Sequence, residues 1–298
     1  MSPVLVFEQL LNGLQFGMIL FLIAVGATLT FGVMKLVNLS HGAMLMVGAY
    51  TASAAAGRMP SFTLAVLTAL LATLMVGLVL ELGVMRRLYA KSHLDQVLAT
   101  FGINIALSEL AIVLWGREPL FTQLPAALEG SVHLFGLEYP LYRLVISAVS
   151  ALAGIALFIV VARTRFGMLV RAWADRPQTL SALGANVRLL AAGVFLISVL
   201  LAALAGVMLS PLLAVHSGMG DPLMILVLAV VVIGGVGSLK GALVASLLVG
   251  VVDTFGRMAW PALLGAQFGV MLSNASVYVL MALVIAWRPG GLFPRYDH

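Results

Sequence analysis

The sequence predicts an all-α protein that crosses a lipid bilayer many times. Of its 298 residues, 62% are hydrophobic and only 9% are charged, whereas soluble domains are about a quarter charged. The hydrophobic residues gather in runs of the roughly 20 residues that one membrane-spanning helix needs. One strongly basic stretch, residues 163–188, separates two of these runs. A chain with so few charges cannot cover a water-facing surface, so the class is a polytopic membrane protein.

The clear membrane segments are six apolar runs: residues 12–34, 62–85, 94–115, 141–162, 190–215 and 267–287. Two further apolar regions, residues 37–56 and 223–255, are interrupted by polar residues and glycines. The second is also too long for one ordinary span. We therefore expect eight to ten membrane segments in a single transmembrane domain, residues 1–298.

The interruptions identify where helices break inside the bilayer. The first region holds Asn38, Ser40, His41 and Gly42, and the second holds the sequence GGVGSLKG at residues 234–241. Irregular backbone and a lysine at membrane depth are costly unless protein or water surrounds them. Each region is therefore expected to be a broken helix or a re-entrant pair.

The basic loops set the orientation, because cytoplasmic loops carry the excess of lysine and arginine. Arg86, Arg87 and Lys91 lie two spans before residues 163–188, so both belong on the cytoplasmic side. Residues 116–140, with three glutamates against one arginine, form the external loop, and residues 216–221 also lie outside. Arg288 and Arg295 favour a cytoplasmic C-terminus. The side of the N-terminus depends on whether residues 37–56 cross the membrane or re-enter.

Residues 163–188 form a basic island that is too long for a simple turn between two spans. The island contains five arginines and one acid, Asp175. A helical segment on the inner face offers a handle by which a soluble partner grips a membrane protein. This favours a transporter that is driven from the cytoplasm.

Polar residues inside the apolar runs are the candidates for a transport pathway. Thr100, Asn104 and Ser108 recur at i, i+4 and i+8, so they share one helix face. Asn274 belongs to a looser polar stripe with Gln267 and Tyr278. Such stripes either line an aqueous path or join helices through hydrogen bonds. The Asn38–His41 cluster has the same two readings: a pathway element, or a tight turn in which His41 is bonded locally.

Several other classes are excluded or disfavoured. There is no cysteine, which removes thiol chemistry. The GGVGSLKG sequence lacks the Gly-Lys-Ser/Thr ending of a Walker loop, so the chain does not hydrolyse ATP itself. The cations show no aromatic interleaving for nucleic acid, and the histidines show no metal-ligand spacing. The few charges within spans, Glu81, Glu109, Asp253 and Arg257, do not form the fuller relay of a proton-driven carrier, and the last two could simply pair at i, i+4.

Four stretches, in order along the chain, resemble the membrane-spanning permeases of bacterial branched-chain amino acid ABC importers, the LivH type. The opening reads LLNGLQFG…NLSHGAMLMVGAY at residues 10–50, and the island reads RTRFGMLVRAWADRPQTLSALGANV. The third is VVIGGVGSLKGALVASLLVGVVDTF, and the last is the ending RPGGLF. The island departs from the family pattern at Trp173-Ala174 and Thr179–Ser181, which bears on the identity of the partner ATPase.

The resemblance implies a cytoplasmic coupling helix that docks on an ATPase, with Arg171, Asp175 and Gly184 as its expected coupling residues. It also implies a second permease subunit, usually in a heterodimer, two ATP-binding subunits and an external solute-binding protein. The chain itself is expected to bind no cofactor, with ATP and Mg on the partners, and to lie in the bacterial inner membrane. The expected pathway residues are Asn38, His41, Thr100, Asn104 and Asn274.

The substrate expected from the resemblance is a branched-chain or other hydrophobic amino acid. Two alternatives stay open within the ABC class: a permease for urea and short amides, and one for sugars. A third, from a different class, is a self-sufficient secondary carrier or channel.

Overall fold

The computed structural model describes residues 3–59, 61–134 and 136–294, and in this part the chain is almost entirely helical. Within these described residues, seven helices are long and apolar enough to cross a membrane. They are α1 (Pro3–Met34), α3 with its continuation (Phe62–Leu88), α5 (His93–Trp115), α6 (Leu141–Arg163), α9 (Val187–Leu209), α11 (Leu239–Leu264) and α12 (Ala266–Trp287). An all-α polytopic membrane protein is thereby confirmed, while the count of eight to ten segments stays a prediction.

Both interrupted regions contain a short helix. In the first, residues 35–38 are not helical, with Lys35 at φ +52°, and α2 (His41–Ala56) begins at the histidine of the polar cluster. In the second, α10 (Gly220–Gly234) ends at the GGVG sequence, and α11 begins after Ser238, whose hydroxyl accepts a hydrogen bond from the Gly241 amide at 3.0 Å. The predicted breaks are therefore present at both places.

Several predicted boundaries shift. The first helix begins at Pro3 rather than residue 12, and α9 ends at Leu209 rather than residue 215. The α3 helix continues through a π-helical turn, η1 (Glu81–Met85), into α4 (Arg86–Leu88). A π turn inserts one extra residue per turn and is a frequent feature of functional sites.

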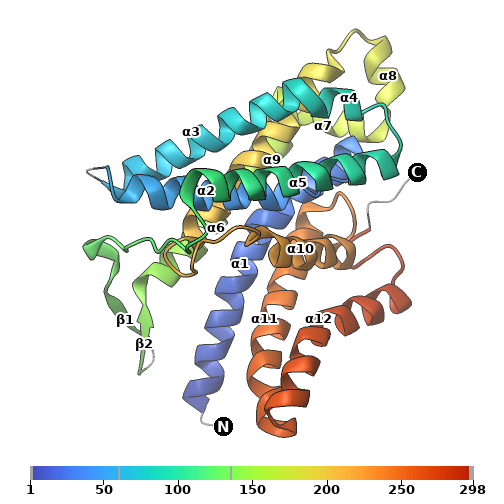
Figure 1. Cartoon of the computed structure of the whole chain (residues 1–298). Helices are drawn as coiled ribbons and strands as arrows, with labels where there is room; N and C mark the ends of the chain where they lie inside the picture. Colours follow the sequence, from blue (N-terminus) through green and yellow to red (C-terminus); the bar gives the residue numbers. More distant parts are fainter. Residues whose placement is uncertain (1–2, 60, 135, 295–298) are drawn as a thin grey trace.

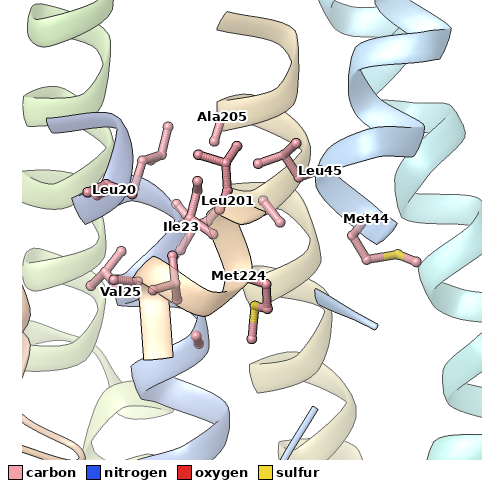
Figure 2. Close-up of a cluster of buried hydrophobic side chains, with 14 of the residues drawn as sticks. Leu20, Ile23, Val25, Met44, Leu45, Leu201, Ala205 and Met224 are labelled. Carbon is pink, nitrogen blue, oxygen red and sulfur yellow. The ribbon is translucent and has the colours of Figure 1, made fainter. Parts of the chain in front are cut away.

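Helix α1 runs through the middle of the bundle, between α9 and α11 and beside α6 (Figure 1). Its packing with α11 depends on small residues, because a Cβ atom on Gly17 would lie 2.8 Å from the Leu247 Cα. Such close backbone approach is how helices associate in lipid, where no hydrophobic force drives them together. Figure 2 shows the centre of the core, in which Leu20, Leu45, Leu201 and Met224 come from α1, α2, α9 and α10.

The external loop is not purely helical. It forms a short antiparallel hairpin of β1 (Ser131–Leu134) and β2 (Leu137–Pro140), preceded by a 3-10 turn, η2 (Ala126–Leu128). Leu120 and Val215 exchange two backbone hydrogen bonds of 2.9 and 2.8 Å. Residues 116–140 and the segment after α9 therefore lie at the same end of the bundle, as the sequence predicts.

The opposite end carries the basic island, which folds as α7 (Arg165–Asp175) and α8 (Pro177–Ala182) (Figure 1). The N-terminal end of α1 lies away from it, beside the external loop, since Arg143 at the start of α6 donates a hydrogen bond to Asn12. The C-terminal segment lies at the island's end, where Pro289 and Asp175 line one cavity. Arg295 is outside the described residues.

Candidate functional site

The turn into the basic island is built for close contact between α6 and α7. Thr164 caps α7 by accepting a hydrogen bond from the Gly167 amide at 3.1 Å. A Cβ atom on Gly167 would lie 2.2 Å from the Val161 carbonyl oxygen. Arg171, one turn further along α7, donates a hydrogen bond to the same carbonyl. Thr164, Gly167 and Arg171 thus fix α7 against the end of α6.

The tip of the island is exposed and apolar. Leu183, directly after α8, is 79% exposed. Gly184 follows with φ at +80°, a backbone region that favours glycine. A large apolar side chain presented on a fixed turn outside the bundle is suited to a pocket on another protein. Of the three predicted coupling residues, Gly184 lies at this tip, whereas Arg171 and Asp175 lie on α7.

One large cavity joins the island to the first broken region. It has a volume of about 980 Å³. The junction of α7 and α8 lines it with Asp175, Arg176 and Pro177. The non-helical segment before α2 lines it with Lys35 and Val37. Its remaining walls come from the end of α1, the start of α5, the end of α10 and the C-terminal segment. The cavity thus leads from the island to the residue next to Asn38.

The polar cluster at the start of α2 is buried and bonded. The Asn38 side-chain oxygen accepts hydrogen bonds from the Ser40 amide at 3.1 Å and the Ser40 hydroxyl at 2.6 Å. Thr100 of α5 accepts one from the Leu39 amide at 3.1 Å. These bonds pair the Leu39 and Ser40 amides of a non-helical segment. Without them the two amides would lack hydrogen-bond partners inside a bilayer.

His41 is fixed at both ring nitrogens. Its Nε2 lies 3.0 Å from the Ile23 carbonyl oxygen, and its Nδ1 lies 3.2 Å from the Ser198 hydroxyl. A carbonyl only accepts, so Nε2 carries the proton and, in the neutral ring, Nδ1 accepts from Ser198. His41 therefore joins α1, α2 and α9 at one point.

Asn104 joins α5 to the second broken region. Its amide donates a hydrogen bond to the Asp221 carboxylate in the first turn of α10 at 2.9 Å. Four residues further along α5, the Ser108 carbonyl accepts a hydrogen bond from the Ser217 hydroxyl at 2.9 Å. The N-termini of the two short helices also meet, because a Cβ atom on Gly42 would lie 3.0 Å from the Gly220 oxygen. The four predicted polar residues Asn38, His41, Thr100 and Asn104 thus surround the junction of α2, α5 and α10.

Asn274 lies apart from this junction. It is exposed on α12, as are Gln267 and Tyr278 of the same predicted stripe. An exposed amide in the middle of a span is costly in lipid, so this face is suited to a partner or to water.

Sequence reasoning missed two contributors. The sequence predicts an external loop at Asp221, yet this residue accepts a hydrogen bond from Asn104 in the middle of α5. The Asp-Pro pair at residues 221–222 is the local signal for a helix start there. Ser198 is a single hydroxyl in an apolar run and gives no signal of its own. Within residues 3–59, 61–134 and 136–294, no group of acids and histidines is arranged to hold a metal ion.

The comparisons with known proteins agree with one another. Residues 9–287 match the model of the family described as branched-chain amino acid transport system / permease component. The high-affinity branched-chain amino acid transport permease BraD of Pseudomonas aeruginosa is 30% identical, covering 97% of this chain and 95% of that protein.

LivH of Salmonella typhimurium is 26% identical over the same shares of both chains. The probable LivH of Methanocaldococcus jannaschii is 24% identical over 90% of this chain and 86% of its own. No solved structure gives a significant match. The relatives are named as transport permeases rather than enzymes, and this chain belongs to the family of branched-chain amino acid transport system permease components.

Proposed function

We propose that this chain is the membrane-spanning subunit of an ATP-driven importer in the bacterial inner membrane, and that it moves branched-chain or other hydrophobic amino acids. Membership of the permease family and the names of the relatives support the substrate class. The full chain has no Walker sequence, so in this proposal another subunit hydrolyses the ATP.

The observation that carries the coupling proposal is the shared cavity. Asp175 and Pro177 of the island and Lys35 and Val37 of the broken segment line the same space of about 980 Å³. A displacement of α7 and α8 therefore changes the shape of a cavity that reaches the residue next to Asn38.

In this mechanism the ATPase grips the island at Leu183 and Gly184, while Arg171 holds α7 to the end of α6. Closure of the ATPases on ATP moves the island together with α6. The permease then exchanges between inward-facing and outward-facing arrangements, and ATP biases the exchange because the partners bind the two arrangements with different affinity.

The proposed pathway runs along the junction of α2, α5 and α10, with Asn38, His41, Thr100 and Asn104 as its residues and Asn274 on the face of α12. In the present arrangement the first three are bonded to backbone or to neighbouring side chains. Opening requires these bonds to exchange for water or substrate. Polar side chains at the N-termini of broken helices are suited to a zwitterionic solute, because such termini carry partial positive charge.

As one component of a transport system, the chain acts with other proteins. The proposed assembly holds a second permease subunit, two ATP-binding subunits that carry ATP and Mg, and an external binding protein that delivers the substrate. The exposed amides of α12 and the apolar tip at Leu183 are two features available for such contacts.

The test is purification of the tagged chain from its native membrane, followed by mass spectrometry and uptake assays in liposomes. We expect ATPase subunits with Walker sequences and a second polytopic subunit, and ATP-dependent uptake of leucine when the binding protein is added. Uptake of urea or of a sugar instead of leucine would reassign the substrate. Ion-driven flux by the chain alone, with no ATPase recovered, would contradict the proposal and favour a secondary carrier.

A further inference from the structure

A second cavity, separate from the junction described above, lies on the flank of the bundle between α1, α6 and α11. Its volume is about 420 Å³. Its lining is apolar except at one place: Phe21 and Val25 come from α1, Gly154 and Phe158 from α6, and Lys240 from the first turn of α11. We call this cavity the flank groove.

The flank groove owes its floor to a glycine. A Cβ atom on Gly154 would lie 2.4 Å from the Phe21 ring. The edge of the phenyl ring therefore lies close to the α6 backbone at this position. A larger residue at position 154 would push the Phe21 ring and α6 apart. The glycine therefore lets α1 and α6 approach each other closely beside the groove.

The side chains around the groove favour lipid over a protein partner as its neighbour. On α6, every exposed residue between Arg143 and Arg163 is apolar, including Leu152, Ile155 and Phe158. Large aliphatic and aromatic side chains without polar groups are what a hydrocarbon environment permits. The exposed face of α12, with its amides and tyrosine, differs in this respect.

Lys240 lies at the cytoplasmic mouth of the groove. It lines a neighbouring cavity together with Arg288 and Pro289, and Pro289 in turn lines the cavity of the basic island. The cytoplasmic leaflet is the one that carries anionic headgroups, and these attract lysines near the surface. The apolar flank groove with the exposed Lys240 at its cytoplasmic end is therefore complementary to an anionic phospholipid, in charge and in polarity.

We propose that the flank groove is a binding site for one anionic phospholipid of the inner leaflet. Its acyl chain lies along Phe21, Gly154 and Phe158, and its phosphate pairs with the Lys240 ammonium. This assigns a role to the lysine of the GGVGSLKG sequence, which no step of the proposed transport mechanism uses. It also makes the lipid a brace between α6, which leads into the island, and α11.

The test measures the motionally restricted fraction of spin-labelled lipid around the purified complex in phosphatidylcholine nanodiscs. A trace of labelled phosphatidylglycerol or of labelled phosphatidylcholine serves as the probe. For Lys240→Gln we expect the preference for phosphatidylglycerol to fall about fivefold, the equivalent of the about 1 kcal/mol that one lysine contributes near an anionic surface. The matched control is Lys91→Gln, an exposed lysine of the same membrane face outside the groove, which is expected to keep the preference.

Filling the groove tests the acyl chain separately. Ala151→Trp places an indole in the groove, whereas Ala156→Trp places one on the exposed face of the same helix. We expect only the first to reduce the restricted fraction of both labelled lipids. Equal spectra for the two tryptophan variants, or equal preference in the two glutamine variants, would overturn the proposal.

The competing occupant is a helix of the second permease subunit. Because the chain has no cysteine, Ile155→Cys gives a single reactive site beside the groove. Labelling of this cysteine by a membrane-soluble maleimide in the assembled complex is the expected result. Its crosslinking to the second permease would show that the groove is a protein interface and would refute the lipid assignment.

Discussion

The Asn104 amide donates a hydrogen bond to the Asp221 carboxylate at 2.9 Å, although 117 residues separate the two along the chain. One helical turn away, Ser217 bonds to the Ser108 carbonyl. The segment that enters α10 is thus held to α5 at two successive turns. The starts of α10 and α2 meet beside these bonds, and this is where we expect a pathway to open.

Replacing Asn104 with leucine tests whether this contact belongs to the transport pathway. The variant removes the donor to Asp221 and puts an apolar side chain in its place. We expect assembly of the complex to persist, with a loss of about 1 kcal/mol in the stability of the chain because Asp221 is exposed. Substrate uptake is expected to fall at least tenfold, roughly the effect of 1.4 kcal/mol on a rate.

The comparison change is Gln267→Leu, which also replaces a side-chain amide in a span; Gln267 is exposed on α12, whereas Asn104 is buried. Uptake in proteoliposomes and size-exclusion profiles of the complex are measured for both variants. Normal uptake by the Asn104 variant would assign this residue to helix packing alone.

The breaks before α2 and after α10 follow from the sequence, because polar residues and glycines that interrupt an apolar run favour the end of a helix. The contacts across the breaks do not. The pairing of Asn104 with Asp221 depends on how α5 and α10 are placed, and no local pattern encodes that placement. Likewise, the sequence around His41 fits either a pathway or a local turn. Only the structure shows that its ring contacts the Ile23 carbonyl and the Ser198 hydroxyl.

The close approach of Gly42 and Gly220 leaves no room for a side chain at position 220. A Cβ atom on Gly220 would lie 2.1 Å from the Gly42 carbonyl oxygen. The three nearest atoms are all backbone atoms of Gly42, so none of them can rotate away as a side chain could. Gly220→Ala is therefore expected to destabilise the chain by about 1–3 kcal/mol, as overpacking does in other cores.

Gly102→Ala is the control, since a Cβ atom there meets nothing within 4 Å. This variant is expected to be neutral or more stable by less than about 1 kcal/mol. Thermal unfolding of the two purified variants, followed by loss of the monodisperse peak, gives the comparison. A Gly220 variant as stable as the Gly102 variant would mean that α2 and α10 do not pack as closely as described.

A third prediction concerns Glu81, the first residue of the π-helical turn, and Tyr89, which follows α4. Glu81 is 0% exposed, accepts a hydrogen bond from the Tyr89 hydroxyl and lies 3.8 Å from the Arg86 Nε. Burial, and the hydrogen bond to Glu81, raise the pKa of Tyr89 well above its usual value, so its hydroxyl stays protonated and remains a donor.

Tyr89→Phe leaves the buried carboxylate without this donor and is expected to cost about 1–3 kcal/mol, the range for a buried polar group that loses its partner. Tyr278→Phe removes a hydroxyl that is on an exposed residue of α12 and is expected to change stability little. The measurement is thermal stability of both variants in the same detergent. Equal stability would mean that Arg86 alone satisfies Glu81.

The sequence places Glu81 within a span, and this position is correct. It did not show that the carboxylate turns inward. That orientation comes from the π turn at residues 81–85, which has no reliable sequence signal. The Asp253–Arg257 pair is the opposite case, because its i, i+4 spacing predicted the two hydrogen bonds of 2.8 and 3.1 Å that the structure shows.

Charge reversal on the island tests the coupling proposal. Arg171 is exposed and donates to the Val161 carbonyl, so Arg171→Glu removes the tie between α7 and α6 and changes the charge that a partner meets. Insertion in the membrane is expected to be normal, because four arginines of the island remain to hold it in the cytoplasm. ATP hydrolysis by the complex should continue while uptake per ATP falls severalfold. Arg188→Glu, which reverses a charge beyond the tip of the island, supplies the comparison; unchanged uptake per ATP in the Arg171 variant would show that α7 transmits no motion through this residue.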